Sequence, residues 1–257
     1  MLRSALAHLR WRGQDYAYVL RRQADALPRP RRRGVVADPT PEERAGERGP
    51  RPDVILVPGV YESWRFMAPL ASLLSRHGHR VHVLRSLGYN RRPVPAGAAL
   101  LGRYLAEHDL RDVVVVGHSK GGLIGKLAMV REDPAGRIRS LVAISTPFAG
   151  SDYARWVPLP AVRAFVPTDA TLALLDAEPE VNARITSVYS RFDPHIPAGS
   201  ALDGARNVEL ATPGHFRVLA DPQLGAVLLD AVSARASSGV GRPRRPPLGA
   251  PRTPAVG

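Results

Sequence analysis

Residues 112–130 read DVVVVGHSKGGLIGKLAMV. The run of valines predicts a buried strand, and the apolar run after the paired glycines predicts a helix. Between them, residues 117–121 form the pattern G-x-S-x-G, with Ser119 at its centre. A turn this tight forces the serine into a strained backbone conformation, and it requires glycines where side chains would collide with the neighbouring strand and helix. We therefore predict a nucleophile elbow that presents the Ser119 hydroxyl at the tip of a sheet.

A nucleophilic serine needs a base, and the base needs an acid to orient it. In chains with this elbow the order is serine, acid, histidine. Asp193 follows the predicted strand 185–190 in a loop that contains two prolines, and His215 lies in the loop after the short predicted strand 207–210. We predict Asp193 as the acid and His215 as the base, and Asp203 remains an alternative acid.

Two further histidines compete for the role of base. His195 lies two residues from Asp193 in the same loop, which is a poor geometry for a ring that must bridge the acid and the serine. His118 adjoins Ser119 in sequence but points away from it across the elbow. We therefore prefer His215 to both.

An oxyanion hole needs two backbone donors. The elbow supplies one, because it aims the N–H of Lys120 at the reacting oxygen. The second is expected from the loop after the first core strand, residues 53–58, where Gly59 lets the backbone turn sharply. We predict the N–H of Val60 as this donor, with that of Tyr61 as the less favoured alternative.

These segments resemble the α/β-hydrolase superfamily, specifically its bacterial lipase and esterase branch. The resemblance runs from about Asp53 to Asp230. It rests on the loop VPGV at 57–60, the elbow, the segment ISTPFAGS at 144–151, and the acid and base loops. The chain departs from many relatives at Pro58, where they carry a histidine before the glycine. Membership implies serine hydrolase chemistry on a carboxylic ester and leaves the substrate open.

Apolar strands alternate with amphipathic helices through the core, which predicts a doubly wound, mostly parallel sheet, the α/β-hydrolase fold. Strands are expected at 53–58, 80–84, 112–116, 138–145, 185–190 and 207–210, and helices at 63–77, 96–108, 120–131 and 222–234. A lid-like insertion is expected at 152–182. It is richer in apolar side chains than a solvated loop needs, and we predict that it forms an acyl pocket. The candidate substrate-binding residues are Tyr61, His118, Trp156 and Phe165.

The chain of 257 residues carries a net charge of +13. Most of the surplus lies outside the predicted domain. Residues 1–52 have 12 Arg and 6 acidic residues, and residues 231–257 have 5 Arg and no acidic residue. Residues 53–230 are nearly balanced, with 19 basic and 17 acidic residues. Nearly all the basic residues are Arg, which indicates a general compositional bias. We therefore predict a small-molecule ester or lipid as the partner and no nucleic acid.

The predicted organisation has four parts. Residues 1–27 form an amphipathic helix, 28–52 a Pro- and Arg-rich linker, 53–235 the catalytic domain, and 236–257 a disordered, basic, Pro-rich tail. The N-terminal helix has two possible binding surfaces. It either docks on its own domain or, with the basic tails, contacts an anionic membrane surface. Unless the helix covers apolar surface on the domain, the domain alone is expected to hydrolyse a small soluble ester.

The chain has no cysteine and no cluster of residues typical of a metal site, so we expect neither a metal nor a cofactor. Charged residues interrupt the N-terminal segment, which therefore has neither the apolar core of a secretion signal nor a membrane span. We expect a cytoplasmic protein with peripheral membrane contact as an option. Two other functions remain open: an acyltransferase with the same triad, and a catalytically idle hydrolase fold tethered by its basic tails.

Overall fold

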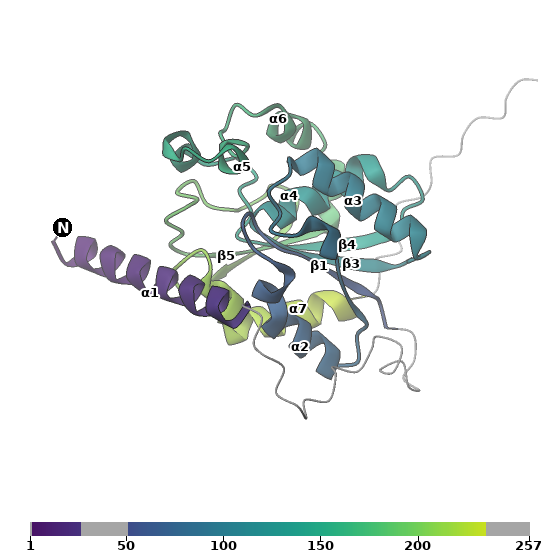
Figure 1. The fold of residues 1–257 in the computed structure, drawn as a ribbon, viewed down its shortest axis with the longest axis horizontal. Coiled ribbons are helices and arrows are strands. Elements are labelled where there is room, and N and C mark those ends of the chain that lie inside the picture. The colour runs from purple at the N-terminus through teal and green to yellow at the C-terminus, as the bar shows by residue number, and fades with distance from the viewer. Residues whose placement is uncertain (1, 27–50, 235–257) are drawn as a thin grey trace, which may run out of the picture.

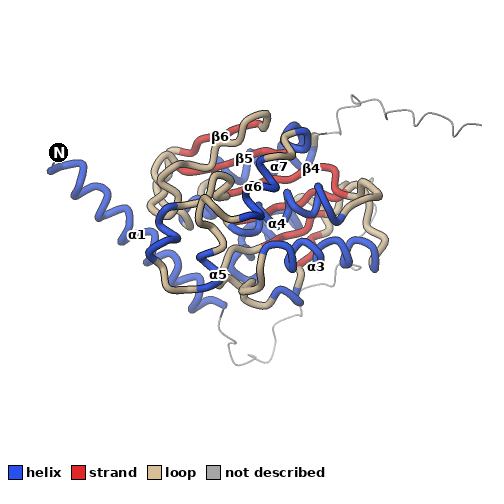
Figure 2. The backbone as a smooth tube through the Cα atoms, turned by 90° about the horizontal axis from the view of Figure 1, so that it is seen from above, coloured by secondary structure: helices blue, strands red, loops and turns tan. Residues whose placement is uncertain are grey.

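The computed structural model describes residues 2–26 and 51–234. Apart from residues 51 and 52, the predicted linker lies outside the described residues, as does the whole predicted tail. The domain is built on one parallel sheet of six strands, in the order β2-β1-β3-β4-β5-β6 (Figures 1 and 2). The strands are β1 (Val54–Val57), β2 (Val81–Val83), β3 (Val113–His118), β4 (Ile138–Ile144), β5 (Ile185–Ser190) and β6 (Arg206–Leu210). The predicted doubly wound parallel sheet is confirmed.

Helices cover both faces of the sheet. They are α1 (Leu2–Ala26), α2 (Ala68–Arg76), α3 (Val94–Glu107), α4 (Lys120–Leu127), α5 (Pro160–Arg163), α6 (Ala170–Asp176) and α7 (Pro222–Ser233). Short helical turns are η1 (Trp64–Met67), η2 (Arg85–Leu87), η3 (Ala128–Glu132), η4 (Asp152–Trp156), η5 (Glu180–Arg184) and η6 (Arg217–Ala220). Because successive strand residues face opposite sides, Ile55 and Val57 pack with α3 and α4, whereas Val54 and Leu56 pack with α2 and α7. All six residues of β3 are buried, as expected for a central strand.

The order of the strands determines where a site can form. From β1 the chain first goes to β2 at one edge, and it then returns to place β3 on the other side of β1. Loops leaving β1 and β3 therefore diverge to opposite faces, which opens a crevice at the carboxyl ends of these strands. The predicted oxyanion loop follows β1, and the elbow follows β3.

Two glycines allow α4 to pass directly over the strands. A Cβ atom on Gly121 would lie 2.0 Å from the carbonyl oxygen of Val57, and one on Gly117 would lie 2.4 Å from the backbone of Gly121. No side chain fits at such distances. This close approach lets the turn between β3 and α4 be completed by Ser119 alone.

Residues 152–182 lie between β4 and β5 and contain η4, α5, α6 and most of η5. We call this segment the cap. Its first half faces the crevice, but Leu172 and Leu175 of α6 are buried in the core cluster on the α3 and α4 face. Half of the cap is thus an integral part of the domain.

Helix α1 is docked on its own domain, where it contacts η1 and η6. Tyr18 and Val19 pack against the core on that side, whereas Leu6, Leu9 and Leu20 are exposed. The first turns of the helix extend away from the domain (Figure 1), whereas His8 and Trp11 pack against Phe192. At 25 residues α1 is long enough to cross a bilayer, but neither it nor any other described helix is also sufficiently apolar.

Candidate active site

Ser119 occupies the turn between β3 and α4. Its backbone has φ 51° and ψ −117°, a strained conformation that residues other than glycine rarely adopt. Its N–H donates to the carbonyl of Ile144 at 2.7 Å, which ties the turn to β4. The side chain lines a cavity, although the residue is only 7% exposed. This is the geometry of the predicted elbow.

His215 and Asp193 form a buried pair in the loops after β6 and β5. The ring Nδ1 of His215 lies 2.7 Å from Asp193 Oδ2. Asp193 Oδ1 accepts two backbone hydrogen bonds, from His195 at 2.8 Å and Ile196 at 3.1 Å. With Nδ1 donating to the carboxylate, the other nitrogen of His215 is free to act as a base. His215 also lines the cavity that Ser119 lines.

Charge and burial act in opposite directions on this pair. Burial alone would lower the pKa of His215, but Asp193, its hydrogen bond, Asp15 and Glu62 outweigh burial and raise it. Burial alone would likewise raise the pKa of Asp193, but His215 and the N–H of His195 outweigh burial and lower it. Asp193 is therefore a carboxylate at neutral pH, as an orienting acid must be.

The rival base, His195, is held differently. Its Nε2 lies 3.1 Å from the hydroxyl of Tyr16, and its Nδ1 is 3.9 Å from Asp193 Oδ1. Burial and the neighbouring His215 lower the pKa of His195 to about 4. The ring is therefore neutral at physiological pH and makes a much longer contact with the acid than His215 does.

His118 is fully buried beneath the site. Its Nδ1 lies 2.9 Å from the carboxylate of Glu62, and its Nε2 lies 3.2 Å from the backbone carbonyl of His215. Glu62 in turn accepts the N–H of Gly59 at 2.7 Å. His118 is not among the residues that line the cavity. From the sequence we predict His118 as a substrate-binding residue. In the structure its contacts instead connect the loop after β1 to the loop of His215.

The side chain of Lys120 has a role that the sequence did not predict. Its ammonium donates to the carbonyls of Asn90 and Arg92, and Asn90 donates to the carbonyl of Pro58 at 2.7 Å. Burial lowers the pKa of Lys120 to about 8. The residue that follows the elbow serine is thus linked through Asn90 to the loop that carries Val60.

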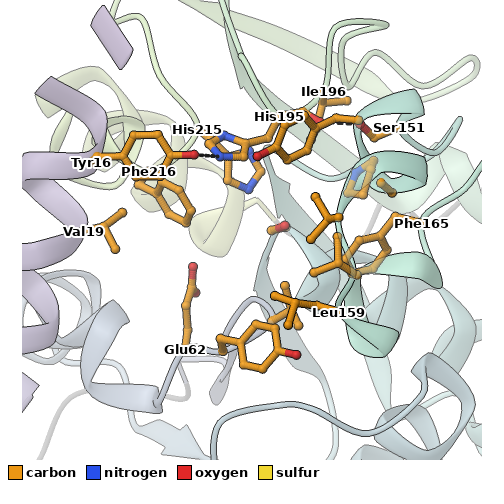
Figure 3. Close-up of a pocket in the computed structure, with 18 of the residues that line it drawn as sticks. Tyr16, Val19, Glu62, Ser151, Leu159, Phe165, His195, Ile196, His215 and Phe216 are labelled. Atoms are coloured by element: carbon orange, nitrogen blue, oxygen red, sulfur yellow. Dashed lines mark hydrogen bonds between the residues drawn. The ribbon is translucent and has the colours of Figure 1, made fainter. Parts of the chain in front are cut away.

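The cavity has a volume of about 310 Å³ and lies between the cap and α1 (Figure 3). Most of its lining side chains are apolar. Of the four candidate substrate-binding residues, Tyr61 and Phe165 line it and His118 does not. Trp156 is 84% exposed and lies outside the lining. The sequence reasoning missed Tyr16, Val19 and Gln23, through which α1 forms one wall. Nothing in the pattern of α1 distinguishes these residues from the rest of an amphipathic helix.

Asp193, His195 and His215 are the one group among the described residues whose donor atoms lie close enough together, within 4.8 Å, to hold a metal ion. Both oxygens of Asp193 already accept hydrogen bonds, including the one from His215. A cation would have to displace that bond. The donors therefore fit an acid and base pair better than a metal site.

Comparisons with known proteins agree with the fold. The mature form of the lipase BlEst2 from Bacillus licheniformis has a similar structure, with a TM-score of 0.59 and 15% identity, covering 72% of this chain and 93% of that one. The enol-lactonase from Burkholderia xenovorans has a TM-score of 0.53 and 19% identity, covering 74% and 94%. The putative non-heme bromoperoxidase BpoC from Mycobacterium tuberculosis has a TM-score of 0.56 and 16% identity, covering 72% and 93%. At these identities the likeness shows the fold.

No curated protein matches the sequence significantly. The model of a protein family, described as the alpha/beta hydrolase fold, matches residues 52–195. This range holds β1 to β5, the elbow with Ser119 and the loop with Asp193. The chain belongs to the alpha/beta hydrolase family.

Proposed function

We propose that the protein is a serine hydrolase that cleaves a carboxylic ester through Ser119, His215 and Asp193. One observation carries the proposal: the pair of Asp193 and His215, with atoms 2.7 Å apart, opens on the same cavity as the strained Ser119. A serine activated by a histidine that a carboxylate orients is the arrangement needed for acyl transfer.

In the proposed reaction, His215 removes the proton from the Ser119 hydroxyl as its oxygen attacks the ester carbonyl. The imidazolium that forms is stabilised by Asp193, which remains ionised. His215 then returns the proton to the leaving alcohol, which departs and leaves an acyl-enzyme. Water then attacks the acyl-enzyme while His215 takes its proton, and His215 returns this proton to the Ser119 oxygen as the carboxylic acid is released.

The developing oxyanion is assigned to the backbone N–H groups of Val60 and Lys120. Two features support this assignment. Lys120 is the first residue of α4, where backbone N–H groups are not used within the helix. Val60 lines the cavity, and the contact of Lys120 with Asn90 and of Asn90 with Pro58 fixes its loop relative to the elbow.

The cavity favours an ester with an apolar acyl group of modest size. Its volume of about 310 Å³ is at the lower end of the range of about 300–1,000 Å³ for ligand pockets. Val157, Leu159, Val162 and Phe165 line it on the cap side. Burying an alkyl or aryl group against these side chains removes apolar surface from water, which favours binding. They provide no hydrogen-bond or ionic partner for a charged group.

Two other functions use the same residues. An acyltransferase would pass the acyl group to an acceptor other than water, and an idle fold would not form the acyl-enzyme at all. A fluorophosphonate probe separates the last from the others, since it reacts only with an activated serine. Release of free acid from the acyl-enzyme then separates a hydrolase from a transferase.

We expect Ser119→Ala and His215→Ala to reduce ester hydrolysis by a similar and very large factor, as much as about 10⁶-fold, because triad residues act as a unit. His195→Ala is the matched control and should cost far less, since the N–H that it gives to Asp193 belongs to the backbone. Rates on a short soluble ester provide the measurement. If His195→Ala were the more damaging histidine variant, His215 would not be the base.

The rate should depend on pH through His215, whose pKa is raised above 6.5. Only the neutral ring accepts a proton, so kcat/KM should fall about tenfold per unit as the pH drops below this pKa. His195, with a pKa of about 4, stays neutral through this range. A profile that is flat between pH 5 and 8 would contradict the assignment.

Acyl preference should respond to Phe165 and not to Trp156. Phe165→Ala enlarges the cavity, so the preferred acyl chain should become longer. Trp156→Ala is the control because that side chain is 84% exposed and outside the lining. Relative kcat/KM values over a series of esters of graded length test this. Equal shifts in both variants, or none in Phe165→Ala, would place the acyl group elsewhere.

The proposal includes peripheral contact with an anionic membrane. On docked α1, Leu6, Leu9 and Leu20 remain exposed together with Arg10 and Arg21. Each basic residue near an anionic surface contributes roughly 1 kcal/mol. The full chain should therefore sediment with anionic vesicles at low salt and be released at high salt. Replacing the three leucines by serine should weaken binding, and retention on neutral vesicles would argue against an electrostatic contact.

A further inference from the structure

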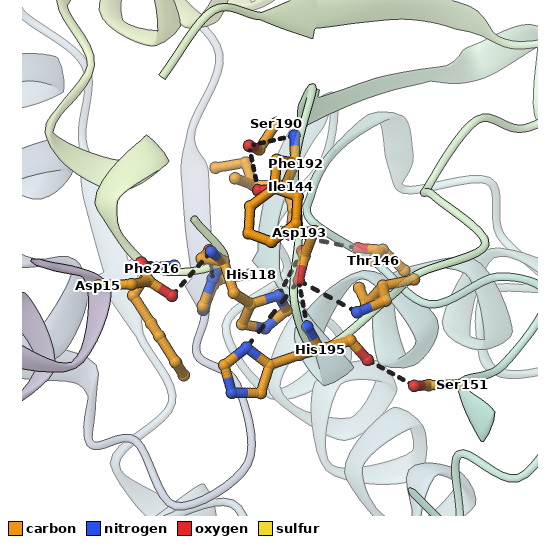
Figure 4. A network of polar contacts seen from close by, with 12 residues as sticks. Asp15, His118, Ile144, Thr146, Ser151, Ser190, Phe192, Asp193, His195 and Phe216 are labelled. Atoms are coloured by element: carbon orange, nitrogen blue, oxygen red, sulfur yellow. Dashed lines mark hydrogen bonds and ion pairs between the residues drawn. The ribbon is translucent and has the colours of Figure 1, made fainter. Parts of the chain in front are cut away.

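Asp15 lies in the middle of α1 and is completely buried. Its carboxylate accepts three backbone hydrogen bonds from the loop that carries the proposed base. Figure 4 shows Asp15 beside Phe216 of this loop. Oδ2 accepts from the N–H of His215, and Oδ1 accepts from those of Phe216 and Arg217, all at 2.9 Å. Asp15 thus binds the proposed base, His215, from a position 200 residues earlier in the sequence.

The loop is shaped to receive this carboxylate. Gly214 has φ +118°, which disfavours other residues, and a Cβ atom there would lie 2.4 Å from Asp15 Oδ1. The guanidinium of Arg217 also donates to the side chain of Gln14 at 2.8 Å. Helix and loop therefore meet through a fitted contact and not through apolar packing alone.

Three hydrogen bonds fix His215, and their partners come from three different parts of the chain. Asp193 holds the ring through Nδ1, His118 holds the backbone carbonyl, and Asp15 holds the backbone N–H. Ring orientation and backbone position are separate requirements for a base that must reach Ser119. His118 and Asp15 both meet the second requirement, His118 from β3 and Asp15 from α1.

Charged and titratable groups surround His215 from four elements. They are Asp193 and His195 after β5, His118 on β3, Glu62 after β1, and Asp15 on α1. Burial lowers the pKa of His215, and Asp193, Asp15 and Glu62 together raise it. Removing the charge of Asp15 therefore removes one of the contributions that keep this pKa high.

We propose that Asp15 is a positioning residue for the base, so that α1 is part of the catalytic apparatus and not a separable tail. The inference rests on the proposed function in one respect, namely that His215 is the base. It changes an expectation from the sequence, because a domain that begins near residue 51 would lack both this carboxylate and one wall of the cavity.

Asp15→Asn is the most informative variant. The amide has the size of the carboxylate but only one acceptor oxygen, so its NH₂ group must face at least one of the three backbone donors. The loop should shift, and kcat/KM should fall by about 10- to 100-fold, since misplacing a catalytic group by about 1 Å can cost about 10²-fold. The loss should appear in kcat more than in KM, and fluorophosphonate should label Ser119 more slowly.

A second readout needs no substrate. The ring protons of His215, assigned with His215→Ala, report its titration by NMR in the full chain. Asp15→Asn should lower the pKa of His215, so the acid limb of the rate profile should move to lower pH. Gln14→Ala is the matched control for loosening of the helix, and Asp230→Asn, at an exposed position, is the control for loss of one negative charge.

The outcomes separate the two proposals. If the unaltered chain neither hydrolyses esters nor labels at Ser119, the proposed function fails, but a lowered His215 pKa in Asp15→Asn still shows that Asp15 acts on His215. An unchanged pKa, or an effect as large in Gln14→Ala, would overturn it. Asp15→Ser, which leaves Gly214 unhindered, is the second variant. If neither Asp15 variant folds, Asp15 serves stability and the positioning role is wrong.

Discussion

The close approach of α4 to the strands is the constraint on which the rest of the site depends. With a Cβ position on Gly121 only 2.0 Å from the carbonyl oxygen of Val57, the helix can begin directly above β1. The turn from β3 must then be made within Ser119 itself, at the cost of a strained backbone. The same contact brings the elbow beside the loop after β1, so that Ser119 and the proposed oxyanion donors share one crevice. A bulkier residue at this position would separate them.

The proposed base, in contrast, depends on polar contacts between distant segments. His215 lies in a loop after the last strand, and β6 is the most exposed strand of the sheet. Its position is therefore set by Asp15, His118 and Asp193 rather than by the strand. Buried carboxylates on several sides also favour the imidazolium that the proposed reaction requires. Asp15 and Asp193 thus both fix the position of His215 and place negative charge near its ring.

The sequence predicted the features that local patterns encode. The strand and helix ranges agree with the structure to within a few residues, because valine runs and helical periodicity are local signals. The elbow was predictable for the same reason. Contacts over long distances were not. The carboxylate of Asp15 meets donors some 200 positions away, and the same N-terminal pattern suits a docked or a membrane-bound helix. The roles of His118 and of the Lys120 ammonium depend on which loops fold against them, and the exposure of Trp156 depends on how the cap folds.

The division between the matched region and the rest of the chain explains why family membership leaves the substrate open. Residues 52–195 contain the proposed nucleophile, the proposed acid and the cap, which are the parts on which the proposed class of reaction depends. The base loop and α1 lie outside this region, and α1 provides Tyr16, Val19 and Gln23 to the wall opposite the cap. An ester bound in the cavity would contact both walls. Its shape is therefore limited by a helix that the family pattern does not describe, and relatives that lack such a helix are poor guides to the ligand of this cavity.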